Sequence, residues 1–360
     1  MGSLAFGPRV RTAAASVAVI FLTTAAAAQE PADRRGEVHE EALVERVIVD
    51  AHVTGPDGTP IPNLGPGDFV VKVDGKPIPL ESVDWLARGS PEVDLRVLSE
   101  IASSADGVST PEAAPGRLIV LFFQTDYEIS RLHGLLRMGI QARRFLRTLD
   151  PTDRVAVVSY DSHLKLRQDF TADQSKLESA IHAAIRRGEG SAPDPESHPS
   201  LGKRLDPDEA RRCATPERAL EIVARALAPI PGGKSMLFFG WGLGTIGGLT
   251  GPNASERQAW SDAMRRMAEA RVNIFTLDIT DADYHSLEGS IQQIADLTGG
   301  HYDKTHLFPE LVMDRVARAI SGRYVLVFVK PSAPRGEHSI EVALAGGHKG
   351  RVFARQFYVD

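Results

Sequence analysis

The pattern of apolar and polar residues divides the chain into a central part, in which strands alternate with helices, and two outer parts made of strands. Five apolar runs predict the central strands: Leu118–Phe123, Arg154–Tyr160, Leu164–Phe170, Lys234–Gly240 and Val272–Ile279. Such continuous apolar runs are typical of strands buried in a parallel sheet. Between them, apolar residues at three- and four-residue spacing predict amphipathic helices. The alternation indicates an α/β fold with a doubly wound, mostly parallel sheet.

Local signals at the ends of these helices support the assignment. Thr215 followed by Pro216 predicts a helix start, because Thr is a good N-cap residue and Pro is tolerated at the first helical position. The stretch 171–174, Thr-Ala-Asp-Gln, is similar to a capping box. Glycines at 299–300 and at Gly322 predict helix ends.

Short strands separated by Pro, Gly and Asp turns predict antiparallel β-structure on both sides of the central part. The first β-segment spans residues 43–88 and the second spans residues 323–360. Three runs in each predict strands: Leu43–Val53, Asp68–Val73, Ile78–Trp85, Tyr324–Lys330, His338–Leu344 and Arg351–Tyr358. The central domain between them is expected over residues 117–322.

The N-terminus has the order of a secretory signal peptide. Two arginines precede an apolar stretch at 13–22, and the small residues 25–28 offer a cleavage site before Gln29. The stretch is about ten residues long, too short to cross a bilayer comfortably. We therefore expect residues 1–28 to be a signal peptide and the mature protein to be secreted or periplasmic, without a transmembrane helix. An uncleaved anchor or an unstructured tail is the alternative.

Composition marks three connecting segments. Residues 29–42 are charged and contain Pro and Gly, and residues 89–116 are rich in Ser, Ala, Pro and Asp, so both are expected to be linkers. Residues 188–212 are rich in Pro, Ser and charged residues and interrupt the strand–helix pattern. We interpret this segment as an insertion loop on the surface of the central domain.

Charge and motif content narrow the function classes. The net charge of −6 is unfavourable for nucleic acid as the main partner. The single cysteine, Cys213, allows no intramolecular disulfide, and we interpret it as a surface thiol. No metalloprotease histidine spacing, P-loop or nucleophile elbow is present, and Gly240–Gly248 is interpreted as a flexible loop. These features favour a non-enzymatic protein, with an exported hydrolase that uses an unrecognised site as the alternative.

Four passages of the central part resemble a von Willebrand factor A domain. They are LIVLFF with its polar turn, DRVAVVSYDS with its LRQDFT partner, GGKSMLFFGWG, and VNIFTLDI followed by IADLTGGHY. The β-segments on both sides look like the flanks of exported bacterial proteins called VWFA-related, so the resemblance covers nearly the whole mature chain. It implies a von Willebrand factor A-like domain and one small β-sandwich-like unit that strands from both ends form together. Two separate β-units are the alternative.

The resemblance also implies a site for Mg²⁺, from which this sequence departs. The family's site uses Asp-x-Ser-x-Ser after the first strand, a Thr from a later loop and an Asp after the fourth strand, all oxygen ligands that suit a hard cation. Here the first Asp position holds Gln124, and the fourth-strand position falls beside Trp241, between two glycines. Thr215 matches the loop Thr but already serves as a predicted N-cap. We therefore expect a degenerate site that binds no metal and no other cofactor.

A shifted metal site is the alternative at the same edge. Asp126, Glu128 and Ser130 supply oxygen atoms that suit Mg²⁺ or Ca²⁺, with Asp161 or Asp278 as additional ligands. Without a metal, the acidic residues of this turn are explained by the positive end of the helix dipole that follows.

Together these features predict an exported interaction or adhesion module that binds a protein or an extracellular polymer through one edge of its sheet. The binding role rests on the family resemblance, since fold does not prove function. The expected partner surface, together with the insertion at 188–212, consists of Gln124, Thr125, Asp126, Tyr127, Glu128, Ser130, Thr215 and Trp241.

Overall fold

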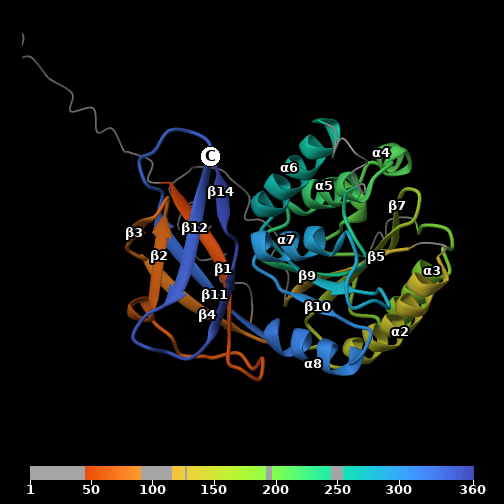
Figure 1. Cartoon of the computed structure of the whole chain (residues 1–360), viewed down its shortest axis with the longest axis horizontal. Coiled ribbons are helices and arrows are strands. Elements are labelled where there is room, and N and C mark those ends of the chain that lie inside the picture. Colours follow the sequence, from red (N-terminus) through yellow and green to blue (C-terminus); the bar gives the residue numbers. More distant parts are fainter. Residues whose placement is uncertain (1–44, 91–115, 126–127, 192–196, 245–253) are drawn as a thin grey trace, which may run out of the picture. The chain divides into compact units, whose positions relative to one another are not determined.

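The computed structural model describes residues 45–90, 116–125, 128–191, 197–244 and 254–360 (Figure 1). The predicted signal peptide, the first linker and nearly all of the second linker lie outside the described residues. The same holds for two residues of the expected partner surface, Asp126 and Tyr127.

A six-stranded sheet forms the centre of the α/β part, in the order β10-β9-β8-β5-β6-β7. All neighbouring strands in it run parallel except β7, which is antiparallel to β6. Its strands are β5 (Leu118–Gln124), β6 (Arg154–Tyr160), β7 (Leu164–Thr171), β8 (Lys234–Gly240), β9 (Val272–Asp278) and β10 (Tyr302–Lys304). The predicted α/β fold with a mostly parallel sheet is therefore confirmed, and the carboxyl ends of its parallel strands meet at one edge.

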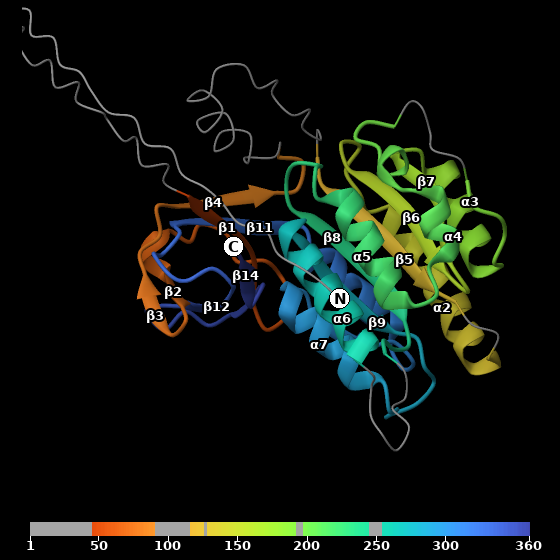
Figure 2. The same ribbon diagram turned by 90° about the horizontal axis from the view of Figure 1, so that it is seen from above.

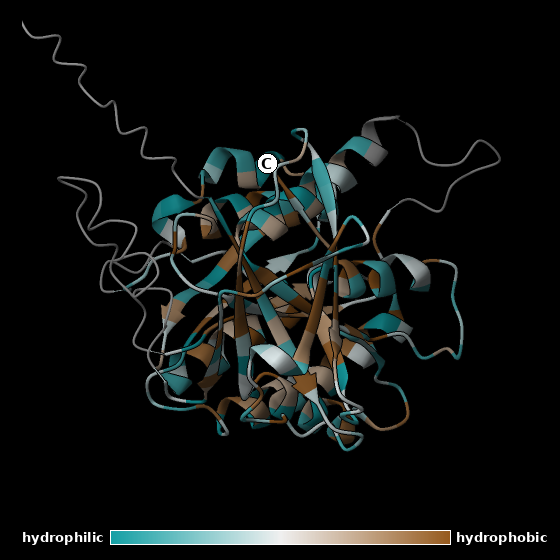
Figure 3. Ribbon diagram, turned by 90° about the vertical axis from the view of Figure 1, so that its left-hand side faces the viewer, coloured by the Kyte–Doolittle hydropathy of each residue, from teal (hydrophilic) through white to brown (hydrophobic). Residues whose placement is uncertain are grey.

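Helices cover both faces of this sheet (Figure 2). They are α2 (Ile129–Leu146), α3 (Gln174–Ile185), α4 (Pro207–Arg212), α5 (Pro216–Leu227), α6 (Ala254–Glu269), α7 (Glu288–Thr298) and α8 (Pro309–Ala319). Alternate residues of β5 point to opposite faces, as strand geometry requires. Phe122 packs with residues of α5, α6 and α7, and Phe123 packs with residues of α2, α3 and α8. Figure 3 accordingly shows apolar segments on the strands and polar segments on the outer sides of helices.

The N- and C-terminal strands form one β-sandwich rather than two separate units. One sheet has the order β13-β1-β11-β4 and the other the order β14-β12-β2-β3. Their strands are β1 (Arg46–Thr54), β2 (Phe69–Val73), β3 (Lys76–Ile78), β4 (Ser82–Ala87), β11 (Gly322–Val329), β12 (Glu337–Leu344), β13 (Arg351–Ala354) and β14 (Phe357–Val359). Each sheet combines strands from both ends of the sequence, and the core between the sheets contains Val49, Phe69, Tyr324 and Phe328. The predicted shared β-unit is confirmed.

Two strands that the sequence predicts as single elements are each split between the two sheets. The run Ile78–Trp85 contains the end of β3 and most of β4, and the run Arg351–Tyr358 contains β13 and most of β14. In the first, Pro79 has no N–H to give to a ladder, which favours a break. In the second, the break falls at Arg355, whose guanidinium donates to the backbone oxygens of Ala268 and Ile48.

The segment 188–212 is more ordered than a surface loop. It contains a 3-10 turn at Gly202–Arg204 and the helix α4. The carboxylate of Asp169 accepts hydrogen bonds from the Ser200 hydroxyl at 2.6 Å and from the Leu201 N–H at 2.7 Å, and all three residues are buried. The prediction of a loop is wrong for the part that follows residue 196, because a buried carboxylate on β7 holds its backbone in place.

The prediction of a surface thiol is also wrong. Cys213 is only 2% exposed, and burial raises the pKa of its thiol to about 11. Its Sγ lies 3.3 Å from the backbone oxygen of Thr215, to which it donates a hydrogen bond. A buried thiol of this kind is an inert packing group rather than a nucleophile.

Buried charges join the sandwich to the α/β part. Asp50 on β1 accepts hydrogen bonds from both Nε (2.9 Å) and Nη2 (2.8 Å) of Arg271, and from Nε of Arg323 at 3.0 Å. Burial alone would raise the pKa of Asp50, but the two guanidinium groups hold it well below its usual range. Nearby, burial lowers the pKa of His52 to about 4, and its Nδ1 contacts the backbone oxygen of Ala319 at 3.1 Å.

Candidate functional site

A hollow at the carboxyl ends of β5, β6 and β8 brings together three residues of the expected partner surface: Gln124, Thr125 and Trp241. We call this hollow the rim cavity; it has a volume of about 420 Å³. Its wall consists of Gln124, Thr125, Tyr160, Asp161, Ser162, Arg187, Pro216, Trp241, Gly242 and Gly244. In open α/β sheets, ligands bind outside the carboxyl ends of the strands, so this cavity has the expected location of a binding site.

The side chain of Gln124 closes the floor of the rim cavity. Gln124 is 1% exposed, and its Oε1 accepts hydrogen bonds from the N–H groups of Trp241 (3.0 Å) and Gly242 (3.3 Å). Its Nε2 donates to the backbone oxygen of Gly242 at 2.7 Å. Both polar atoms are therefore used inside the protein, where they tie the end of β5 to the turn that follows β8.

The residues described at this edge do not fit a Mg²⁺ ion bound in the family's manner. A Cβ added at Gly240 would lie 2.6 Å from Gln124 Oε1 and 2.2 Å from a ring carbon of Phe238, which leaves no room for a carboxylate. The carboxylate of Glu128 accepts a hydrogen bond from Ser130 Oγ at 2.6 Å and pairs with Nε of Arg131 at 3.1 Å. Within the described part of the chain, no group of three or more His, Cys, Asp or Glu side chains is arranged to hold a metal ion.

Trp241 presents its ring at the border between the rim cavity and a smaller hollow. The guanidinium carbon of Arg131 lies 3.8 Å from the centroid of this ring, which is cation–π geometry. The smaller hollow has a volume of about 180 Å³ and lies between Trp241, the start of α2 and the loop at 280–287. Trp241 is half-buried rather than exposed, and its Nε1 has no hydrogen-bond acceptor among the described residues.

The two threonines of the expected surface have structural partners. Thr215 caps α5, since its hydroxyl accepts the N–H of Arg218 at 3.2 Å, and Pro216 occupies the first turn as the sequence indicates. Thr125 donates its N–H (2.8 Å) and its hydroxyl (3.3 Å) to the backbone oxygen of Tyr160. Of these residues, Thr125, Tyr160 and Pro216 face the rim cavity.

The sequence did not indicate a cluster of cations around Asp161. Lys165 Nζ lies 2.7 Å from this carboxylate, Nε of Arg187 lies at 3.5 Å and Nη2 of Arg167 at 3.9 Å. Burial alone would raise the pKa of Asp161. Hydrogen bonds from Lys165 and from the N–H of Ser162 outweigh this effect and hold the pKa well below its usual range. The sequence does contain a signal for this cluster: Lys165 and Arg167 lie two positions apart on one strand, shortly after Asp161.

Asp278, considered above as a metal ligand, is used internally. Its Oδ1 accepts from the N–H of Thr280 at 3.0 Å, and its Oδ2 contacts Nε2 of His285 at 2.8 Å and accepts from the hydroxyl of Tyr302 at 3.0 Å. Burial, together with this neighbouring carboxylate, raises the pKa of Tyr302 well above its ordinary value. Asp161 is likewise paired, so both carboxylates already have partners inside the protein.

No protein-family model matches the chain, and no curated protein matches its sequence. Comparison of structures finds a von Willebrand factor type A protein from Catenulispora acidiphila, at 10% identity and TM-score 0.41, with 88% of this chain and 74% of that chain covered. It also finds the vWF domain of the type V pili tip protein Mfa5 from Porphyromonas gingivalis, at 12% identity and TM-score 0.37, with 59% and 96% covered.

A third similar structure is the PilB minor pilin from Streptococcus sanguinis, at 10% identity and TM-score 0.37. The match covers 60% of this chain and 63% of the pilin, so the chain spans less than two thirds of that protein's length. At these identities and TM-scores the comparisons support no conclusion about function. The α/β fold with a doubly wound, mostly parallel sheet that the sequence predicts is confirmed by the structure itself. None of the described helices combines the length and the apolar content that a bilayer crossing requires.

Proposed function

We propose that this protein is an exported, non-enzymatic interaction module that binds a protein or an extracellular polymer through the rim cavity without using a metal ion. Export rests on the signal-peptide pattern of residues 1–28. The observation that carries the proposal is Gln124, whose amide uses both polar atoms to hold the Trp241 turn beside an open cavity of about 420 Å³.

The surroundings of Trp241 support a binding role. A large aromatic ring fixed under a guanidinium group is the type of anchor that dominates protein interfaces. The ring lines both hollows, so a partner group placed in either hollow can pack against it. Burial of apolar surface against such an aromatic ring favours binding.

Site-specific photo-crosslinking in cells that produce the full chain tests the proposal. A photoreactive residue replaces Ser162 at the rim or, as a control, Glu341 on the exposed face of β12. We expect an adduct of defined mass from position 162 alone, lost in the Trp241→Ala background, because removal of an anchor of this kind costs about 2 kcal/mol or more. Equal adducts at both positions, or none at position 162, would contradict the proposal.

The metal-free part of the proposal has its own test. The thermal midpoint of the full chain is measured in EDTA and then in millimolar Mg²⁺ or Ca²⁺, because a ligand that binds only the folded state must raise it. We expect no change. A rise that disappears in Glu128→Ala would instead support the shifted site of Asp126, Glu128 and Ser130.

A further inference from the structure

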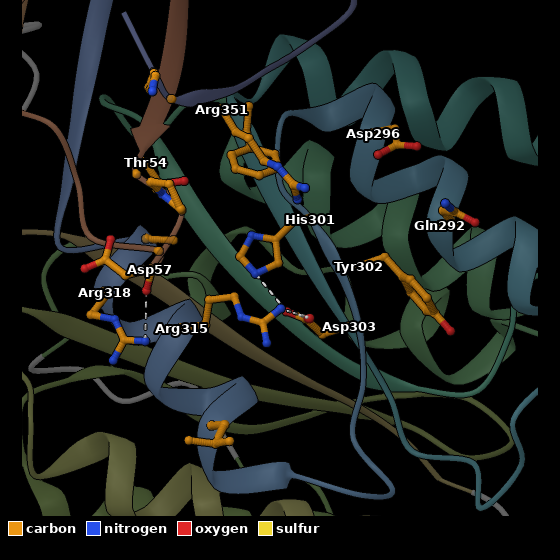
Figure 4. A pocket seen from close by; sticks show the side chains of 18 residues that line it. Thr54, Asp57, Gln292, Asp296, His301, Tyr302, Asp303, Arg315, Arg318 and Arg351 are labelled. Atoms are coloured by element: carbon orange, nitrogen blue, oxygen red, sulfur yellow. Dashed lines mark hydrogen bonds and ion pairs between the residues drawn. The ribbon is translucent and has the colours of Figure 1, made fainter.

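A second cavity, of about 930 Å³, lies between the sandwich and the α/β part and shares no lining residue with the rim cavity. The loop after β1 and the segment that leads into β13 line it from the sandwich, and β10, α7 and α8 line it from the α/β part (Figure 4). We call it the interface cavity. Its volume is within the range of pockets that hold metabolite-sized ligands.

Paired polar side chains form part of the wall of the interface cavity. His301 Nε2 lies 3.0 Å from Asp303 Oδ2, within ion-pair distance, and Arg315 Nη1 donates to the other oxygen of Asp303 at 2.7 Å. The other ring nitrogen of His301, Nδ1, is buried and makes no hydrogen bond with any described residue. Because Arg315 and Asp303 neutralise each other, an anion in the cavity must be held by the other cations of the wall.

Some of the basic side chains in the wall of the interface cavity are not paired with a carboxylate of the described residues. Four basic side chains contribute to it: Arg315, Arg318, Lys349 and Arg351. Arg318 donates to the backbone oxygen of Asp57 at 3.2 Å rather than to a carboxylate. Among the described residues, the side chains of Lys349 and Arg351 have no ion-pair or hydrogen-bond partner. In Figure 4 the side chains of Arg351, His301 and Arg315 follow one another along the cavity.

We propose that the interface cavity binds a small organic anion whose carboxylate or phosphate group is held by Lys349 and Arg351. Guanidinium groups match the geometry of both oxyanions with paired hydrogen bonds, and an ammonium group adds a point charge. This site is separate from the rim and goes beyond the proposed interaction role, since it needs neither Trp241 nor Gln124.

The opposite wall suggests further chemistry of the ligand. Gln292 and Asp296 on α7 and Tyr302 on β10 line the cavity (Figure 4). Asp296 has no partner for its carboxylate among the described residues, and burial raises its pKa. The hydroxyl of Tyr302 is already bonded to Asp278, but the amide of Gln292 and the carboxylate of Asp296 are suitable partners for hydroxyl groups. The ligand is therefore an anion that also carries hydroxyl groups, such as an acidic sugar or a sugar phosphate.

Thermal unfolding of the full chain tests this site with three probes at equal ionic strength. The probes are glucuronate, glucose 6-phosphate and neutral glucose, and they separate a carboxylate source, a phosphate source and the sugar alone. We expect at least one anion to raise the midpoint saturably, by about 5 °C at a hundredfold excess over its dissociation constant, and glucose to leave it unchanged. Absence of a saturable shift with both anions overturns the proposal.

Variants locate the effect within the cavity. Lys349→Gln with Arg351→Gln should abolish the shift, whereas Arg335→Gln, which removes an exposed cation outside the cavity, should retain it. Asp296→Asn should bind the anion about threefold more tightly, because it removes a like charge from the wall. A higher affinity in Asp296→Asn cannot result from impaired folding, so it would show that the anion binds beside this residue. An equal shift in the double variant and in the original protein contradicts the assignment.

Discussion

Gln124 occupies the position where the family resemblance requires a carboxylate, and its amide contributes a bond that a carboxylate lacks. The Nε2 group donates to the backbone oxygen of Gly242, while Oε1 accepts from two N–H groups of the same turn. An Asp at this position keeps acceptors only and is one methylene shorter. The amide side chain thus connects the end of β5 directly to the turn that follows β8.

We predict that Gln124→Asp lowers the free energy of unfolding by about 1–3 kcal/mol, because it leaves the Gly242 oxygen unpaired and buries a charge. Urea unfolding measures the change, and Mg²⁺ should not restore the loss, since Gly240 leaves no room for a second carboxylate. Gln293→Asp, on the exposed side of α7, is the matched control and should change the value by about 0.5 kcal/mol or less. Recovery in Mg²⁺ would show that a metal site had been created.

The burial of His52 predicts one contribution to how the stability of the protein depends on pH. Burial lowers its pKa to about 4, so between pH 6.5 and 4 the unfolded chain binds a proton that the folded chain does not. We predict that stability falls as pH falls through this window, by up to about 3 kcal/mol. The His52→Asn variant should have a flatter profile of unfolding free energy against pH, and exposed His133→Asn should keep the original slope. Parallel profiles for His52→Asn and the original protein would contradict this account.

At the scale of elements, helix α2 depends on a close approach that only glycine permits. A Cβ at Gly134 would lie 1.8 Å from the backbone oxygen of Ile279, in the loop that follows β9. The helix therefore packs directly on the backbone at the carboxyl edge of the sheet. Its first turn carries Glu128 and Arg131 to the rim, so this contact also positions one wall of the site.

We predict that Gly134→Ala destabilises the protein by about 3 kcal/mol or more, since the helix must move off the sheet to make room for a methyl group. Gly289→Ala in α7 is the control, because nothing lies within 4 Å of its added Cβ. That substitution should stabilise by about 0.5–1 kcal/mol through the unfolded chain. Thermal unfolding of both variants provides the comparison, and equal effects would show that the approach is not tight.

Local sequence patterns predict the helices and strands well. They do not predict which distant residues contact one another. Thr215 and Pro216 start a helix because capping involves neighbouring residues, so the sequence predicts it correctly. The bond between Gln124 and Gly242 spans 118 positions, and the sequence indicates only that Gln124 lies at a strand end. The two broken strands are missed for a related reason, because each run continues in the other sheet and only the packed sandwich shows it.

At the scale of the whole molecule, Asp50 and two arginines connect the sandwich with the α/β part. Arg271 reaches Asp50 from the turn before β9, and Arg323 reaches it from β11 within the same sheet. A carboxylate held by two guanidinium groups is well balanced in charge, and removal of the acid deletes an ion-pair partner that both arginines share at a buried position.

We predict that Asp50→Asn costs about 3–5 kcal/mol, with the exposed Asp314→Asn as a near-neutral control. The pKa of Asp50 is lowered by folding, so its contribution is present above the unfolded pKa of about 4 and is lost as pH falls below it. Urea unfolding at pH 7 and at pH 3 should show a smaller difference between variant and original at the lower pH. A constant difference would indicate that the charge is not the cause.

Each sheet of the sandwich contains strands from both ends of the chain, so the sandwich can be completed only after the last strands have been synthesised. During synthesis, β1 to β4 emerge first, but β1 requires β11 and β13, and β2 requires β12. The α/β part lies between them and has all its strands available earlier. The early β-strands therefore wait with unpaired edges until the final residues arrive, and this interval is when they are most exposed to pairing with another chain.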